Sequence, residues 1–476
     1  MRGHSYWLDE VFAAEGPSAS CAPLAGDHRS DVCIVGGGYT GLWTALSLKE
    51  RDPSLDVTLI EARYCGYGAS GRNGGFLMSW SPKFAIFAQK FGMQDAVQLN
   101  RLSCANVVEI GAFCEENGID CEYRRDGWLW ISSNKAQHDA WRPTLDLLEK
   151  AGESTFEAMD LAEARRRSGS SEVTGAVFEP GVASVQPAKL VRGLRRVALA
   201  KGVKIYEDTP MTRLEQGRPP VVHTPGGRVT ASRVVLALNA WAGAIPRFRR
   251  SVLQVAGDQL LTEPIPEKLS ALGLRDGMCL SDSRLLVFGG RVTKDGRLNF
   301  WKAGGGFVFG GQIGTAWDGP STRISECMEV LARLFPSLAD VKLAATWRGQ
   351  VTRTTSGLPF FGAYAECPDI LYGHGYCGNG VGPSRMGGKI LASLALGAKD
   401  EWSSNPLVTG VPKKKFPPEP FRYVGARMVR SAVLRKEAAE DAGRAPSLFD
   451  RRLARLAPAG LVPLSSKKKS TSAADH

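Results

Sequence analysis

Near the start of the chain, continuous runs of hydrophobic residues stand on either side of a segment whose hydrophobic residues repeat at helical spacing. "DVCIV", residues 31–35, is a continuous apolar run that predicts a buried strand. "YTGLWTALSLKER", residues 39–51, repeats its apolar residues at helical spacing and predicts a helix. A "PS" pair then breaks the helix, and "DVTLIE", residues 56–61, predicts the next strand. Together these segments predict a βαβ unit at the start of the folded region.

The remaining pattern is mixed and returns later to strand–glycine–helix pieces. Apolar spacing predicts helices over 92–118, 136–168, 186–202 and 324–336, an antiparallel strand pair over 284–290 and 296–306, and a strand, glycine-rich turn and helix over 369–397. This order predicts a nucleotide-binding domain built from separated segments, with a second domain inserted between them.

The expected boundaries follow from these patterns. The nucleotide-binding domain comprises 31–82, 181–246 and 341–410, and the inserted substrate domain comprises 83–180 and 247–340. Residues 1–30 are predicted to form an irregular arm, although "SYWLDE" could pack its aromatic residues on the body. Residues 411–476 are predicted to be a basic extension with a linker, helices near 422–442 and 448–457, and a disordered end.

Composition and charge narrow the class of protein. The chain has 476 residues, 43% of them hydrophobic, which is enough for two domains with a large core. No apolar run approaches the ~20 residues of a membrane-spanning helix, and "MRGHSYWLDE" has no secretory pattern. We therefore expect a soluble, cytoplasmic protein.

The net charge of +12 is concentrated at one end, because residues 411–476 carry 15 Lys and Arg against 6 Asp and Glu. This distribution argues against a nucleic-acid groove across the body. The basic extension could bind an anionic membrane or a partner, or its helices could dock on the body while its end stays solvated; the second alternative is favoured.

Ten cysteines are scattered without a C-x-x-C pair, and with six histidines no zinc spacing can be built. Free thiols and no metal site are expected.

A dinucleotide fingerprint lies between the first predicted strand and helix. Gly36, Gly38 and Gly41 fit G-x-G-x-x-G, and Glu61 ends the second strand 20 residues after Gly41. Glycines there allow backbone amides and the helix N-terminus to meet a pyrophosphate, and the acid accepts hydrogen bonds from ribose hydroxyls. The alternative is a glycine turn in an unrelated α/β protein, but the strand–turn–helix context favours a dinucleotide and the acid disfavours NADP.

A second glycine-rich segment, "YCGYGASGRNGGF", residues 64–76, follows the acid directly. A nicotinamide enzyme does not need it, whereas a ligand that runs on towards a flavin ring does. FAD is therefore the expected cofactor.

These residues resemble a known family. "VCIVGGGYTGLWTALSLKE", "VTLIEA" and "GYGASGRNGGF" resemble FAD-dependent amine and amino-acid oxidases of the D-amino-acid oxidase/glycine oxidase superfamily. "GASGRNGG" resembles its γ-glutamylputrescine oxidase-like branch. Within that branch, "SYWLDE", "RRDGWLW", "PGVASVQPAKLVRGLRRVA", "VVLALNAWA" and "GNGVGPS" are most similar to bacterial aminophosphonate oxidoreductases. The resemblance covers about residues 5–410.

The resemblance implies an α/β FAD-binding domain, Rossmann-like and of the glutathione-reductase type, plus an α+β substrate domain with a mixed antiparallel sheet. It implies non-covalent FAD held by Gly36, Gly38, Tyr39, Thr40, Gly41, Glu61, Ala62, Ser70, Arg72, Asn73, Gly74, Gly75, Met211, Asn239, Trp241, Gly378, Asn379, Gly380, Val381 and Gly382. Covalent attachment through Cys65 or Cys377 is the disfavoured alternative.

The implied reaction is oxidation of a small-molecule amine, with O2 or another electron acceptor. Positive charge near the flavin would assist it. Arg72 is a catalytic candidate, with binding of the FAD phosphates as the alternative. Lys302 is the second, for oxygen activation, with a surface lysine as the alternative. His374 could be a base, but a structural hydrogen bond is favoured.

The substrate is constrained by two departures from the amino-acid oxidases. The position of their carboxylate-anchoring arginine falls on Val351, and Arg348 and Arg353, which flank it, are candidates to bind a remote phosphonate or carboxylate. Either arginine could instead form an ion pair in the sheet. In addition, residues 288–290 read Phe-Gly-Gly where relatives often carry His and Tyr. An amine oxidase is therefore the leading hypothesis, with an amine dehydrogenase and a non-catalytic flavoprotein as alternatives.

Overall fold

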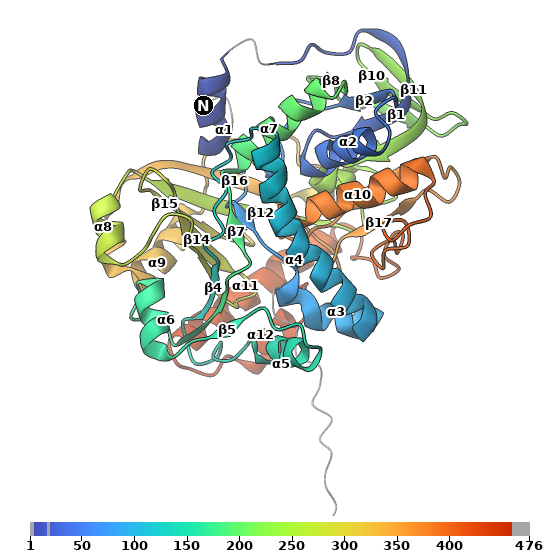
Figure 1. The fold of residues 1–476 in the computed structure, drawn as a ribbon. Helices are drawn as coiled ribbons and strands as arrows, with labels where there is room; N and C mark the ends of the chain where they lie inside the picture. Colours follow the sequence, from blue (N-terminus) through green and yellow to red (C-terminus); the bar gives the residue numbers. More distant parts are fainter. Residues whose placement is uncertain (1–3, 17–19, 459–476) are drawn as a thin grey trace, which may run out of the picture.

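Two large sheets lie side by side in the molecule, with helices around them (Figure 1). The computed structural model describes residues 4–16 and 20–458. Each large sheet has eight strands, and a small two-stranded sheet pairs β3 (Phe76–Leu77) with β7 (Ala183–Ser184).

The first sheet carries the predicted βαβ unit. Its path is β17-β18-β11-β1-β2-β8, and β9 and β10 extend it from β11. The strands from β18 to β8 pair in parallel, and β2 and the second halves of β1 and β11 are mostly buried, as expected for the centre of a parallel sheet. Their bounds are β1 Gly26–Val35, β2 Val57–Ile60, β8 Lys204–Tyr206, β9 Arg213–Glu215, β10 Val221–Thr224, β11 Gly227–Leu236, β17 Phe360–Ala363 and β18 Ile370–His374.

Helices bury the largest core of the molecule against this sheet. α2 packs on α10, and α7 and α4 pack beside them. Trp43 of α2 is fully buried, with its ring 4.9 Å from that of Phe113. The bounds are α2 Tyr39–Arg51, α3 Phe84–Phe91, α4 Met93–Glu116, α7 Pro187–Ala200 and α10 Pro383–Leu396.

The second sheet is mixed, as expected for the substrate domain. Its order is β16-β12-β15-β14-β13-β4-β6-β5, and every pair is antiparallel except β13 with β4. The predicted antiparallel pair at 284–306 is confirmed as β14 and β15. The bounds are β4 Trp128–Ser132, β5 Glu157–Ala158, β6 Gly175–Glu179, β12 Leu253–Thr262, β13 Cys279–Ser281, β14 Phe288–Val292, β15 Leu298–Lys302 and β16 Leu343–Arg353, with α6 Leu161–Ser168, α8 Pro266–Ala271 and α9 Ile324–Leu334 around it.

Two expected boundaries differ from the structure. β16 lies within the 341–410 segment expected in the FAD-binding domain, but it pairs with β12 along its whole length in the second sheet. The helix predicted over 136–168 is instead α5 (Arg142–Lys150), β5 and α6. Gly152, with φ of 70°, ends α5, because this backbone conformation leaves the helix.

Residues 6–15 of the expected irregular arm form a helix, and "SYWLDE" packs on the body, which was the alternative. α1 (Tyr6–Glu15) begins after Ser5, whose Oγ accepts from Leu8 N and donates to the carbonyl of Gly71 at 2.7 Å. Trp7 is buried against Trp347, and its Nε1 donates to the carbonyl of Asn73 at 3.1 Å. α1 thus satisfies two backbone carbonyls of the second glycine-rich segment.

The C-terminal extension docks on the second sheet (Figure 1). α11 (Phe421–Asp441) and α12 (Leu448–Ala454) match the two predicted helices closely. Arg284 donates two hydrogen bonds of 2.6 Å to Asp441, and Glu437 accepts from Leu286 N at 3.1 Å. The predicted disordered end lies outside the described residues, and no helix among those described is long and apolar enough to cross a membrane.

Candidate cofactor and active site

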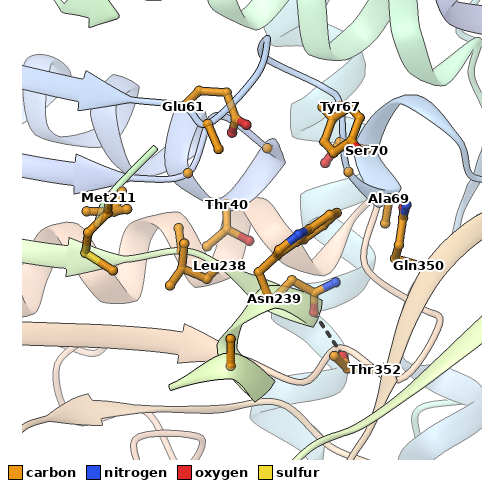
Figure 2. Close-up of a pocket in the computed structure, with 18 of the residues that line it drawn as sticks. Thr40, Glu61, Tyr67, Ala69, Ser70, Met211, Leu238, Asn239, Gln350 and Thr352 are labelled. Carbon is orange, nitrogen blue, oxygen red and sulfur yellow. Dashed lines mark hydrogen bonds between the residues drawn. The ribbon is translucent and has the colours of Figure 1, made fainter. Parts of the chain in front are cut away.

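A cavity of about 720 Å³ runs past the carboxyl ends of the parallel strands to the junction with β16 (Figure 2). Ligands of open α/β sheets bind at this edge. Fourteen of the expected cofactor-binding residues line it: Gly36, Gly38, Tyr39, Thr40, Glu61, Ala62, Ser70, Asn73, Met211, Asn239, Trp241, Gly378, Gly380 and Val381.

The fingerprint glycines make the turn between β1 and α2. Gly36 has φ of 116°, and a Cβ there would lie 2.7 Å from the carbonyl oxygen of Ala237. Gly38 caps α2 without a side-chain hydrogen bond of its own. Tyr39 N, the first amide of the helix, donates to Ser70 Oγ, and the amides that follow it in the first turn have no intrahelical acceptor and can meet an anionic group. Gly41 does not line the cavity; a Cβ there would lie 1.9 Å from the oxygen of Gly36, so this glycine permits the helix to pack on the turn.

Glu61 is the acid of the fingerprint, and its carboxylate faces the cavity (Figure 2). It accepts from Gly37 N at 2.7 Å and from Arg63 N at 3.1 Å. Burial raises the pKa of Glu61 to about 7, against the opposing effect of these backbone donors. Ribose hydroxyls would add further hydrogen-bond donors to this carboxylate.

The second glycine-rich segment packs directly on the first. Ser70 Oγ accepts from Tyr39 N at 2.9 Å, and Gly66 N donates to the carbonyl of Gly37 at 3.0 Å. Cys65 is fully buried beneath Gly37 and does not line the cavity; burial raises the pKa of its thiol well above the ordinary value. The two glycine segments therefore form one continuous wall.

The opposite wall comes from the loop after β11. Asn239 has φ of 39° and accepts from Thr352 Oγ1 at 2.9 Å, which ties this loop to β16 (Figure 2). Trp241 lies close to Gly68, where a Cβ would be 3.1 Å from the indole. Met211, on the segment after β8, lines one end of the cavity.

The other end is formed by β16 and by the turn between β18 and α10. Gln350, Val351, Cys377 and Gly378 line it, and Ser384 of α10 also reaches it. The α10 N-terminus has no side-chain cap, so its dipole favours negative charge there. Both polar atoms of the Gln350 side chain are buried without a hydrogen-bond partner among the described residues.

These features fit FAD. A diphosphate matches the uncapped α2 N-terminus and its glycine turn, Glu61 matches a ribose, and the polar edge of a flavin would satisfy Gln350. Four other expected cofactor residues lie outside the lining, namely Gly74, Gly75, Asn379 and Gly382. Asn379 and Gly382 instead anchor the 375–382 turn, through hydrogen bonds with Ser79 O (3.2 Å) and Asn106 Nδ2 (2.7 Å).

Arg72 also lies outside the lining, and its guanidinium is fully buried among protein acceptors. It donates to Asp318 Oδ1 at 2.9 Å and to the carbonyl oxygens of Tyr67 at 2.8 Å and Trp317 at 3.3 Å. Through these contacts the guanidinium joins the glycine-rich segment to the substrate domain. They give it neither of the two functions expected from the sequence.

Lys302 likewise does not line the cavity. Side chains alternate along a strand, and its neighbour Trp301 lies against Gly74, where a Cβ would be 2.8 Å from the indole. Lys302 therefore points to the other face of the sheet. Burial raises the pKa of Asp282 and of Glu437 there, and the charge of Lys302 opposes both shifts. Its neighbours are thus buried structural carboxyls, Asp282 of the body and Glu437 of α11.

The two arginines flanking Val351 lie in different places. Arg353 donates to the carbonyl of Cys377 at 2.9 Å, and burial lowers its pKa. Arg348 lines a separate cavity, described below. Val351 itself lines the cofactor cavity, where Arg213, two residues after Met211, is the one arginine among the described lining residues.

The Phe-Gly-Gly departure has a packing explanation. A Cβ at Gly289 would lie 2.5 Å from the Trp301 indole, so the neighbouring strand already fills the space of a side chain there. Phe288 faces the opposite side and stacks on Phe300, with ring centroids 5.7 Å apart. Arg291, next along the strand, donates to the carbonyl of Gly74 at 2.9 Å.

His374 is fully buried among Phe248, Phe360 and Tyr372 and does not line the cavity. Burial lowers its pKa to about 3, and neither ring nitrogen has a hydrogen-bond partner among the described residues. It is therefore neutral, and its place outside the cavity does not support the function of a base at the cofactor. All ten cysteines are free.

Sequence reasoning missed Gln350 and Lys83. Lys83 is buried, donates to the carbonyl of Gly357 at 2.9 Å, and has its pKa lowered to about 8 by burial. The like charge of Arg353 lowers this pKa further, which places Lys83 near the turn at the β16 end of the cavity. No motif marks either residue: Gln350 stands beside the Val351 position without being part of a recognised pattern, and Lys83 lies between two apolar stretches.

Comparison with known proteins identifies the class. The model of the FAD dependent oxidoreductase family, DAO, matches residues 31–394. The chain therefore belongs to this family of FAD-dependent oxidoreductases, which act on amines.

Particular relatives cover most of the chain. It is 31% identical over 404 residues to the gamma-glutamylputrescine oxidoreductase of Escherichia coli, covering 83% of this chain and 91% of that one. It is 26% identical over 377 residues to the glycine oxidase of Geobacillus kaustophilus, covering 77% and 93%. The crystal structure of glycine oxidase from Geobacillus kaustophilus superposes with a TM-score of 0.66 at 23% identity, covering 81% of this chain and 99% of that one, which confirms the fold.

Proposed function

We propose that this protein oxidises a primary or secondary amine bearing a remote anionic group, such as an aminophosphonate, to an imine that water converts to an aldehyde. In this reaction the amine loses two electrons and two protons. O2 takes up both and becomes H2O2. FAD, when bound, supplies the two-electron relay between the amine and oxygen.

Val351 carries the proposal. It lines the cavity at the position where the resemblance implies a carboxylate-anchoring arginine in amino-acid oxidases. An apolar side chain there offers an α-carboxylate no charge-assisted hydrogen bond, so a substrate without that group is favoured. The similarity to the gamma-glutamylputrescine oxidoreductase of Escherichia coli supports an amine of this kind.

The protein's own contribution would be positioning and positive potential. The uncapped α10 N-terminus favours negative charge developing at the end of the cavity that Val351 lines. Lys83 and Arg353 add cationic groups behind the 375–382 turn. Gln350 supplies an amide whose donor and acceptor are both free to hold a polar edge.

Substrate profiling tests this function. The FAD-loaded protein is mixed with 2-aminoethylphosphonate, its N-methyl form, γ-glutamylputrescine and glycine, and both anaerobic bleaching of the flavin and H2O2 release in air are recorded. We expect bleaching by at least one of the three amines and not by glycine. Bleaching without H2O2 in air would identify a dehydrogenase, and bleaching by glycine alone would refute the amine proposal.

Val351→Arg provides the matched variant, with Val351→Leu as its control. Arginine should raise the relative kcat/KM for glycine, because it supplies a bidentate partner for the carboxylate. Equal specificity in both variants would show that this position does not face the substrate.

A further inference from the structure

A second cavity, of about 340 Å³, lies where α11 of the C-terminal extension meets the second sheet. It shares no lining residue with the cofactor cavity. Its walls come from β12, the 305–307 turn, the segment before α9, β16 and α11. The polar residues among them are Asp258, Thr322, Arg323, Arg348, Tyr423, Arg427, Arg430 and Ser431.

Four arginines from three separate parts of the chain converge on this cavity, against a single carboxylate, Asp258. Arg430 is neutralised by Glu326, which accepts from it at 2.7 and 2.8 Å. Arg323, Arg348 and Arg427 form no ion pair within the residues that the structure describes. The cavity therefore carries a formal excess of positive charge.

The residues that line the cavity do not supply enough hydrogen-bond acceptors and negative charge for these guanidinium groups. Arg348 donates to the carbonyl of Asp318 at 3.4 Å, but its Nε is buried without a partner among the described residues. Burial, and then the like charges of Arg430 and Arg427, lower the pKa of Arg323. Asp258 offsets little of the excess positive charge, because Ser321 Oγ already donates to its carboxylate at 2.7 Å and burial raises its pKa. A buried guanidinium nitrogen without an acceptor is costly, so the geometry favours an acceptor from outside.

We propose that this cavity binds a small polyanion that carries phosphate or phosphonate groups. Guanidinium groups pair with such oxyanions through two parallel hydrogen bonds. The volume is within the range of small-molecule sites. Arg427 and Ser431 are exposed, so a free ligand can enter from solvent. The proposal does not depend on which amine, if any, is oxidised.

Such a ligand would join the extension to the body. Arg427 and Arg430 belong to α11, whereas Arg323 and Arg348 belong to the body of the protein. An anion between them bridges the two parts, and it stabilises the docked α11 because it binds only when both sets of arginines are together. The cavity is therefore an effector site that controls how firmly the extension is held.

The test uses FAD-saturated protein, because the empty cofactor cavity would itself bind a diphosphate. Pyrophosphate is titrated by calorimetry at constant ionic strength, into wild type and the Arg323→Ala, Arg427→Ala and Arg427→Gln variants. Arg452→Ala is the matched control, since Arg452 is an exposed arginine of α12 outside the cavity. Flavin absorbance and circular dichroism verify that each variant is folded and loaded.

We expect one pyrophosphate site per chain in wild type and Arg452→Ala. Each cavity variant should bind about 10-fold to 100-fold more weakly, the loss expected for one charged hydrogen-bonding group. Hydrogen exchange over 421–441 should slow on binding in wild type and remain unchanged in Arg427→Gln. Equal affinity in wild type and the cavity variants, or no heat from wild type, would overturn the proposal. Binding of a hexaglutamate peptide without binding of pyrophosphate would also overturn it, by assigning the surface to a protein partner.

Discussion

Breaking the ion pair between Arg72 and Asp318 tests whether Arg72, in the glycine-rich segment, has a structural or a catalytic function. The Arg72 side chain is fully buried and that of Asp318 is 15% exposed, with 2.9 Å between Nη2 and Oδ1. At an effective dielectric constant of 20, this separation corresponds to a gross attraction of about 6 kcal/mol. Desolvation removes much of it. Loss of one partner from a buried pair costs about 3–5 kcal/mol, and the partial exposure of Asp318 puts the expected loss near ~3 kcal/mol.

A double-mutant cycle of Arg72→Met, Asp318→Leu and the double variant measures the coupling. Each single variant should lose about 3 kcal/mol of unfolding free energy, and the double variant should lose about 2 kcal/mol less than the sum. Urea unfolding of FAD-free protein, followed by circular dichroism, is the assay, because cofactor affinity then does not contribute.

The matched control is the exposed pair of Arg228 and Asp27, whose side chains are 54% and 60% exposed. Its coupling should stay below about 1 kcal/mol. A coupling below ~0.5 kcal/mol for Arg72 with Asp318, together with a loss of kcat in Arg72→Met, would refute the structural reasoning and restore a catalytic function.

Three further outcomes are expected. The pKa of Glu61 is raised from 4.5 to about 7, so the contribution of its protonated form to stability is present at low pH and is lost as pH rises through this window. Urea midpoints of FAD-free wild type should therefore fall more between pH 5 and 8 than those of Glu61→Gln. Parallel curves for the two proteins would contradict the shift. Gly289→Ala should lose about 1–3 kcal/mol in thermal unfolding, because its Cβ meets Trp301 at 2.5 Å; no loss would mean that the indole moves freely. Lys302→Met should lower the unfolding midpoint, since Asp282 and Glu437 lose a counter-charge, and a variant with unchanged stability but slower flavin reoxidation by O2 would place Lys302 at the cofactor after all.

Local patterns predicted the cofactor wall well. The strand, glycine turn and helix around Gly36 and the acid at Glu61 are determined within one stretch of sequence, and the structure brings them together in one cavity. Local sequence patterns did not predict where long side chains such as Arg72 point. Arg72 is oriented by Asp318, 246 positions later, and no periodicity connects the two.

Strand parity explains the difference at Lys302. A motif places a strand to within a residue or so, whereas a shift of one residue moves a side chain to the other face. Trp301 and not Lys302 therefore lies beside Gly74. The helix at 6–15 was missed for a related reason: its burial depends on Trp347 and Arg291, which are remote in sequence.

Because α1 contacts the glycine-rich segment of the cofactor cavity, the yellow colour of bound flavin can report whether α1 is in place. Its Ser5 and Trp7 hold the carbonyls of Gly71 and Asn73, so the segment that walls the cofactor depends on a helix joined to the body near one end of the chain. A protease that clips between α1 and β1 would release this brace while leaving both sheets intact. Loss of yellow colour during limited proteolysis, ahead of any loss of secondary structure and together with a cut mapped between α1 and β1, would then show that this brace holds the cofactor wall.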